Sequence, residues 1–238
     1  MAVEPIYQLT RSIVIPWMHI WFQWHIEGLE NIPKSGPAIL AFNHVAYLDP
    51  LAIGYIVNKA GRRPRFLSKS ELFADRRIAW VLRGCGQIEV KRGTRDAPMA
   101  LDNAVKALNR GEVVVIFPEG TVTTDPDLNP MPAKTGVTRL ALKSGAPLIP
   151  GAIWGTANVW PKDYGKRWRP RQPMVARIGE HMTIEGSPDV REDWQKAGHQ
   201  IMDAIAALTA SLRPLVPDRR RPPKNRRRDG NLRASKRS

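Results

Sequence analysis

A run of four β-branched residues, 113–116, constrains the fold of this chain more than any other feature. Such a run is typical of a buried strand. A helical pattern at 96–110 precedes it, and Gly111 is placed to end that helix. A second apolar run, at 37–42, is followed by a helical pattern that starts near Leu51. Strands that alternate with helices form parallel sheets, because a parallel pair needs a crossover connection. We therefore predict an α/β fold: a single domain with a mostly parallel sheet flanked by helices.

The length and composition of the chain allow one domain with a sizeable core. The chain has 238 residues, of which 42% are hydrophobic. Its one cysteine, Cys85, excludes an intramolecular disulfide and fits a reducing compartment. The sequence has no phosphate-binding loop, dinucleotide fingerprint, nucleophile elbow or clustered metal-ligand spacing. We expect neither a metal site nor a bound cofactor.

The positive charge of the chain is concentrated at its C-terminus. The formal net charge is +15, and residues 213–238 contain 11 Lys or Arg and 2 Asp, so +9 lies there and +6 elsewhere. This Pro- and Arg-rich segment, 213–238, is predicted to be a disordered basic tail. Such charge suits nucleic acid, anionic lipid or an acidic partner. The tail lacks interleaved aromatic residues and the body lacks a nucleic-acid-binding motif, so we do not expect nucleic acid as a partner.

The N-terminal residues have the pattern of a membrane-surface helix. Residues 4–25 show apolar side chains at spacings of three and four, and the uncharged run 12–26 is 15 residues long. A spanning helix needs about 20 apolar residues, and no signal-peptide cleavage site is present. We predict an interfacial helix at 1–26, with the α/β domain at 27–212. This organisation predicts a peripheral protein on the cytoplasmic face of the cell membrane. The alternative is an ordinary helix packed on the core.

A histidine and an aspartate five residues apart lie between the first predicted strand and its helix. A neutral imidazole accepts a proton near neutral pH, and a carboxylate on its other nitrogen orients it and stabilises the imidazolium. His44 and Asp49 therefore suit general-base activation of a hydroxyl. Asp49 and Pro50 also suit the start of a helix. The two roles are compatible because a carboxylate has two oxygens.

Three further segments accompany this pair in the sequence. They are Gly-Gln-Ile-Glu-Val-Lys-Arg at 86–92, Phe-Pro-Glu-Gly-Thr at 117–121 and Pro-Leu-Ile-Pro at 147–150. With Asn-His-x4-Asp at 43–49, they resemble in type and order the motifs of the glycerolipid acyltransferases, the lysophosphatidic acid acyltransferase family. The resemblance covers roughly residues 26–155. One departure is Val122, where many members carry an arginine.

The resemblance implies a role for each motif residue. His44 would be the general base and Asp49 the group that orients it. The residues implied at the acceptor site are Asn43, Arg92, Glu119, Gly120, Thr121 and Lys134. Arg92 suits a phosphate because a guanidinium donates paired hydrogen bonds, although a solvated strand end is the simpler explanation of the residue alone. Pro150 would form a wall of the acyl site. The proline also indicates a sheet edge, a bulge or a strand end.

The expected activity is transfer of a fatty acyl group to the free hydroxyl of lysophosphatidic acid in phospholipid biosynthesis. The donor would be acyl-CoA or an acyl carrier protein, used as a co-substrate. The partners would be this donor, a lysophospholipid acceptor and an anionic membrane surface. Two alternatives remain open. One is the same chemistry on glycerol 3-phosphate, another lysophospholipid or a glycolipid, and the other is a non-enzymatic lipid- or nucleic-acid-binding protein.

Overall fold

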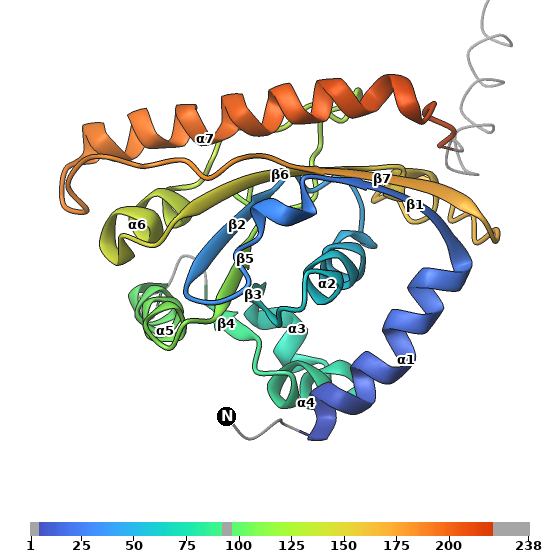
Figure 1. The fold of residues 1–238 in the computed structure, drawn as a ribbon, viewed down its shortest axis with the longest axis horizontal. Coiled ribbons are helices and arrows are strands. Elements are labelled where there is room, and N and C mark those ends of the chain that lie inside the picture. The colour runs from blue at the N-terminus through green and yellow to red at the C-terminus, as the bar shows by residue number, and fades with distance from the viewer. Residues whose placement is uncertain (1–4, 92–96, 221–238) are drawn as a thin grey trace, which may run out of the picture.

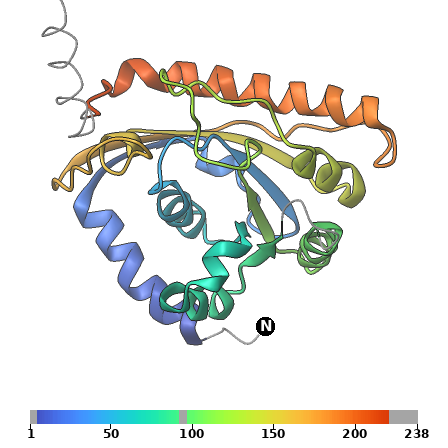
Figure 2. The same cartoon turned by 180° about the vertical axis from the view of Figure 1, so that it is seen from behind.

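The structure, a computed structural model, describes residues 5–91 and 97–220. Within this part of the chain, a seven-stranded sheet lies between two layers of helices (Figure 1 and Figure 2). The strand order is β1-β7-β6-β2-β5-β3-β4. All neighbouring pairs are parallel except β6 and β7. The strands are β1 Phe22–Glu27, β2 Ala38–Phe42, β3 Pro64–Lys69, β4 Ile88–Val90, β5 Val113–Ile116, β6 Leu148–Trp154 and β7 Gln172–Ile178. The predicted α/β architecture is confirmed.

Two core clusters cover opposite faces of the sheet. Successive residues of β2 enter different clusters, because side chains alternate along a strand. Leu40 belongs to the cluster under α1 and α2, and Ile39 to the cluster under α5, α6 and α7. α4 packs against the start of α1. The helices are α1 Pro5–Trp21, α2 Asp49–Lys59, α3 Ser70–Ala74, α4 Arg76–Gly84, α5 Ala97–Asn109, α6 Thr135–Ser144 and α7 Arg191–Leu212.

The N-terminal helix is shorter than predicted. α1 ends at Trp21, and residues 22–27, which we expected to be largely helical, form the edge strand β1. β1 pairs in parallel with β7 over its whole length. The sequence of this segment alternates between apolar and polar residues, with Phe22, Trp24 and Ile26 as the apolar ones. This two-residue period is typical of a strand, and it overlaps the end of the helical pattern in the sequence. The predicted helical unit 1–26 is therefore wrong at its C-terminal end, because β1 belongs to the sheet. None of the described helices has the length and hydropathy required to cross a bilayer.

The beginning of the predicted basic tail is folded. Residues 213–215 form a short 3-10 helix after α7. Val216 is buried, and its carbonyl accepts a hydrogen bond of 2.9 Å from the indole N–H of Trp154. The carbonyl of Pro217 accepts from the Asn158 side chain at 3.0 Å. The prediction that 213–238 is disordered is wrong for 213–220, because one apolar anchor and two backbone acceptors hold the segment. The remainder, 221–238, lies outside the described residues.

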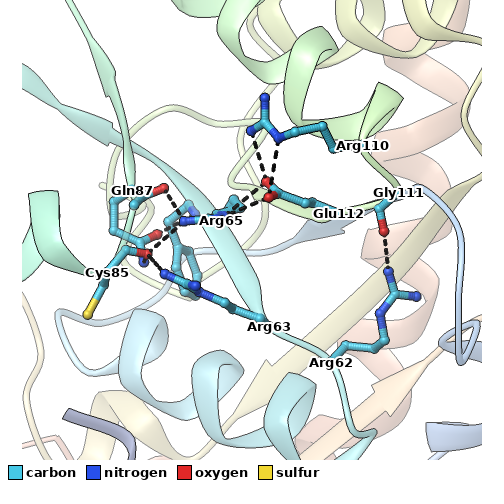
Figure 3. A network of polar contacts seen from close by, with 10 residues as sticks. Arg62, Arg63, Arg65, Cys85, Gln87, Arg110, Gly111 and Glu112 are labelled. Carbon is cyan, nitrogen blue, oxygen red and sulfur yellow. Dashed lines mark hydrogen bonds and ion pairs between the residues drawn. The ribbon is translucent and has the colours of Figure 1, made fainter. Parts of the chain in front are cut away.

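An arginine clamp holds the amino ends of β3 and β5 together (Figure 3). Arg65 at the start of β3 donates two 3.0 Å hydrogen bonds to the two carboxylate oxygens of Glu112, just before β5. It also donates to the carbonyls of Cys85 and Gly86, both at 3.1 Å. The side chains of Arg65 and Glu112 are each only 11% exposed. This planar, multidentate arrangement needs a guanidinium.

Replacing Arg65 by lysine keeps the positive charge but removes the planar guanidinium that donates these hydrogen bonds. Arg65→Lys should lower the free energy of unfolding by about 2 kcal/mol or more, because buried acceptors lose their donors. Arg110, which also reaches Glu112 but is 55% exposed, supplies the control. Arg110→Lys should change stability by less than about 0.5 kcal/mol. Urea unfolding measures both, and equal effects would contradict this account of the clamp.

Candidate active site

Two of the four predicted motifs meet at the carboxyl edge of the sheet. β2, β5 and β6 are parallel neighbours, so the segments that follow them lie side by side. Residues 43–49 follow β2, residues 117–121 follow β5, and the 3-10 helix η2, Thr156–Asn158, follows β6. The His-Asp pair, the Phe-Pro-Glu-Gly-Thr motif and η2 are thereby brought into contact.

Asp49 is the most heavily hydrogen-bonded side chain of this edge. Its side chain is 0% exposed. Oδ2 accepts from Nδ1 of His44 at 2.8 Å and from the N–H groups of Val45 and Ala46 at 2.7 and 2.8 Å. Oδ1 accepts from the Thr156 hydroxyl at 2.6 Å. The buried carboxylate therefore has four hydrogen-bond donors, as a buried polar group requires. Asp49 is also the first residue of α2, but Leu48 is the N-cap and the Asp49 carboxylate caps no helical N–H, so the expected capping role is wrong.

His44 is held with one nitrogen on Asp49. An ionised carboxylate only accepts hydrogen bonds, so the neutral imidazole carries its proton on Nδ1 and its lone pair on Nε2. The ring stacks on Phe117, with centroids 4.0 Å apart and planes 18° from parallel. Its side chain is 14% exposed. This arrangement fixes the ring and leaves Nε2 to accept a proton, as a general base requires.

Glu119 has a different position from the one we expected. Its side chain is 1% exposed, and its two oxygens accept from the N–H groups of His44 at 2.9 Å and Met131 at 3.0 Å. The geometry therefore makes Glu119 a brace between loops, and its role at the acceptor site stays a prediction. Burial raises the pKa of Glu119 to about 7, although the two N–H groups lower it, and the Asp49 charge raises it further.

Asn43 and Pro150 are also structural in this geometry. Asn43 is fully buried, and its side-chain amide pairs with both the N–H and the carbonyl of Ile153, at 2.8 and 3.0 Å. It braces the loop after β2 against β6, and its role at the acceptor site stays a prediction. Pro150 lies in β6, an interior strand, just before pairing with β7 begins at Gly151. It is buried beside Gly179, and its role as a wall of the acyl site stays a prediction.

The other predicted acceptor residues lie near the motif or outside the described residues. Gly120 has a φ of +73°, which favours glycine, and Thr121 is partly exposed beside it. Lys134 is exposed at the start of α6, and its N–H donates to the carbonyl of Pro118 at 2.8 Å. Val122 is buried. Arg92 lies outside the described residues, so its phosphate-binding role stays a prediction.

Sequence reasoning missed two residues of this site. Thr156 contacts Asp49 from 107 residues away, and no spacing in the sequence signals that contact. Phe117 was recognised only as part of a motif, although it stacks on His44. A threonine after an apolar strand is the sole signal for Thr156. No group of three or more His, Cys, Asp or Glu that could hold a metal occurs among residues 5–91 and 97–220.

The family of the chain follows from comparison with known proteins. The family model described as Acyltransferase matches residues 23–154, which is more than half of the chain and contains the His44–Asp49 pair and Glu119. The chain therefore belongs to the acyltransferase family, as the four motifs predicted.

Three relatives show which members of the family the chain is similar to. The chain is 32% identical over 143 residues to the chloroplastic 1-acyl-sn-glycerol-3-phosphate acyltransferase BAT2 of Brassica napus, covering 59% of this chain and 40% of that protein. It is 29% identical over 151 residues to the 1-acyl-sn-glycerol-3-phosphate acyltransferase of Bacillus subtilis, covering 63% and 69%. The crystal structure of the 1-acyl-sn-glycerophosphate acyltransferase PlsC from Thermotoga maritima matches with a TM-score of 0.62 and 26% identity, covering 87% and 79%. The match thus spans less than half of the chloroplastic relative.

The buried Glu119 predicts a pH-dependent stability. The folded protein holds the Glu119 proton more tightly than the unfolded chain, whose glutamate has an ordinary pKa of 4.5. The Glu119 contribution is therefore complete below pH 4.5 and is lost as the pH rises through about 7. Relative to Glu119→Gln, the wild type should lose on the order of 3 kcal/mol of unfolding free energy between pH 4.5 and 7.5. Parallel urea-unfolding profiles for the two proteins would contradict this assignment.

Proposed function

We propose that this protein transfers a fatty acyl group from an acyl thioester to the free hydroxyl of lysophosphatidic acid. The observation that carries the proposal is the His44–Asp49 hydrogen bond of 2.8 Å, beside the Phe-Pro-Glu-Gly-Thr motif. Relatives named 1-acyl-sn-glycerol-3-phosphate acyltransferase support this acceptor, both in chloroplasts and in bacteria. The reaction would serve phospholipid biosynthesis.

The geometry supports direct transfer without an acyl-enzyme. Nε2 of His44 removes the proton from the acceptor hydroxyl, and the resulting oxygen attacks the thioester carbonyl. Asp49 stays ionised and stabilises the imidazolium. When the tetrahedral intermediate collapses, the carbon–sulfur bond breaks and the thiolate leaves. His44 returns its proton to the sulfur, so the products are the new ester and a free thiol.

Two basic residues are proposed to bind the acceptor phosphate. Arg92 and Lys134 supply charge, and Gly120 lets the backbone approach the ligand closely. A second acceptor class follows from Val122, because this buried residue supplies no cation where many family members have one. The chain is also 29% identical over 132 residues to the lyso-ornithine lipid O-acyltransferase of Pseudomonas aeruginosa, covering 56% of this chain and 47% of that protein. A lysolipid without phosphate is therefore the second candidate.

The donor and the membrane are the proposed partners. Acyl-CoA and acyl carrier protein both present the thioester that this chemistry needs. The side of α1 that faces away from the core exposes Leu9, Ile13 and Ile20, which are 56%, 62% and 76% exposed. These residues lie on one helical face, as an interfacial helix requires. We propose peripheral attachment to the cytoplasmic face of the cell membrane.

Loss of the base should abolish transfer. His44→Ala should lower acceptor-dependent thiol release by at least about a hundredfold, the scale expected for a general base. The assay uses a long-chain acyl-CoA and lysophosphatidic acid in mixed micelles. The control is His199→Ala, an exposed histidine of α7. Release that survives His44→Ala would exclude His44 as the base. If the wild type is inactive, the assay is repeated with an acylated carrier protein as donor and with phosphate-free lysolipids as acceptors. Failure with all of these substrates would favour a non-enzymatic binding protein.

The phosphate-binding residues should affect one acceptor class only. Arg92→Gln and Lys134→Gln should each raise KM for lysophosphatidic acid by about tenfold, because each removes one charged contact. They should leave KM for monoacylglycerol, which lacks the phosphate, within about twofold. Lys59→Gln, at an exposed position of α2, is the control. Equal effects on both acceptors would show that these residues do not bind the phosphate.

A further inference from the structure

Thr156 donates a hydrogen bond to Asp49 but lies outside every motif that the sequence indicates. Oδ2 of Asp49 is occupied by His44 and two backbone N–H groups. Oδ1 accepts from the Thr156 hydroxyl at 2.6 Å, with both side chains fully buried. Among the described residues no other donor reaches Oδ1. The orientation of the carboxylate plane therefore depends on this hydroxyl.

We propose that Thr156 is a positioning residue for catalysis, the third member of a Thr156–Asp49–His44 chain. Its hydroxyl holds the Asp49 carboxylate so that Oδ2 faces Nδ1 of His44. It also withdraws negative charge from the carboxylate and so moderates the basicity of the imidazole. This inference rests on the proposed function, because the three hydrogen-bonded side chains include His44, the proposed base of that reaction.

The local backbone is built to place this hydroxyl. Gly155 ends β6 with a φ of +98°, and a Cβ there would lie 2.4 Å from the carbonyl oxygen of Pro173. The chain therefore turns sharply at a position that only glycine fits. The turn itself is held by backbone bonds, in which the carbonyl of Thr156 accepts from Val159 at 3.0 Å and Trp160 at 3.1 Å. The Thr156 hydroxyl takes no part in them, which distinguishes it from a turn-capping group.

The effect on His44 has a definite sign. A donor on Oδ1 stabilises negative charge on Asp49, which weakens the attraction between that charge and an imidazolium. Loss of the hydroxyl should therefore raise the pKa of His44. Among the described residues, the titratable side chains hydrogen-bonded to His44 are Asp49 and, through the backbone N–H, Glu119. No hydrogen bond links Thr156 to Glu119, so a comparison of two variants at position 156 isolates the Asp49 route.

Three substitutions separate positioning from packing. Thr156→Val removes the hydroxyl and keeps the shape, whereas Thr156→Ser keeps the hydroxyl. Thr209→Val is the matched control, because Thr209 is also buried and donates only to the Ile205 carbonyl within α7, at 2.8 Å. A merely structural role would lower the melting temperature in Thr156→Val without altering the titration of His44.

The first measurement is an NMR titration of the histidine side chains in the full chain. The protein has five histidines, and the His44 signal is assigned by its loss in His44→Ala. In Thr156→Val the pKa of His44 should rise by about half a unit or more, with wild-type values in Thr156→Ser and Thr209→Val. An unchanged or lowered pKa in Thr156→Val, or an equal shift in Thr156→Ser, would overturn the proposal.

The second measurement is the pH profile of thiol release. The acid limb of kcat/KM should move upward in Thr156→Val by the same amount, which gives about threefold lower kcat/KM on the acid side, with KM nearly unchanged. The titration needs no substrate, so the two hypotheses fail separately. A shifted His44 pKa in Thr156→Val, together with a wild type that transfers no acyl group, would contradict only the proposed function. An active wild type with an unshifted pKa in Thr156→Val would contradict only the role of Thr156.

Discussion

The buried carboxylate of Asp49 is the interaction on which the rest of the site depends. It accepts four hydrogen bonds from two segments, 43–49 and η2, and so joins the loops that follow β2 and β6. A buried charge is tolerated only when it is well solvated by donors, and these four supply that solvation. The same charge orients His44. Stability of the loop and orientation of the base are therefore two consequences of one interaction.

A second buried carboxylate extends this frame to the third loop. Glu119, after β5, bonds the N–H of His44 and the N–H of Met131, so it ties the base to the segment between Thr121 and α6. Burial outweighs these two donors and raises the pKa of Glu119. The two carboxylates thus hold different parts of His44. Asp49 orients the imidazole ring, and Glu119 fixes the backbone N–H. The His44 imidazole is therefore held in place before any substrate arrives, as the proposed general-base catalysis requires.

Local patterns predicted the parts of the fold and site that depend on near neighbours. The β-branched strand, the crossover helices and the His44–Asp49 pair all follow from spacing within a few residues. The features that sequence reasoning missed depend on distant partners. β1 forms because it pairs with β7, which lies about 150 residues later in the sequence. The Glu27–Arg177 hydrogen bond joins residues with the same separation. Thr156 reaches Asp49 only once the sheet has brought β6 beside β2. The burial of Glu119 and Asn43 and their bonds to distant backbone groups likewise depend on packing, so their residue types alone could not indicate them.

The measurement that tests this account most directly is the tautomer of neutral His44, read from the ¹⁵N chemical shifts of its ring nitrogens. The account predicts a proton on Nδ1, donated to Asp49, and an unprotonated Nε2 that is able to take the proton of a hydroxyl. A neutral ring with its proton on Nε2 would contradict it, because such a ring has no lone pair to offer the acceptor.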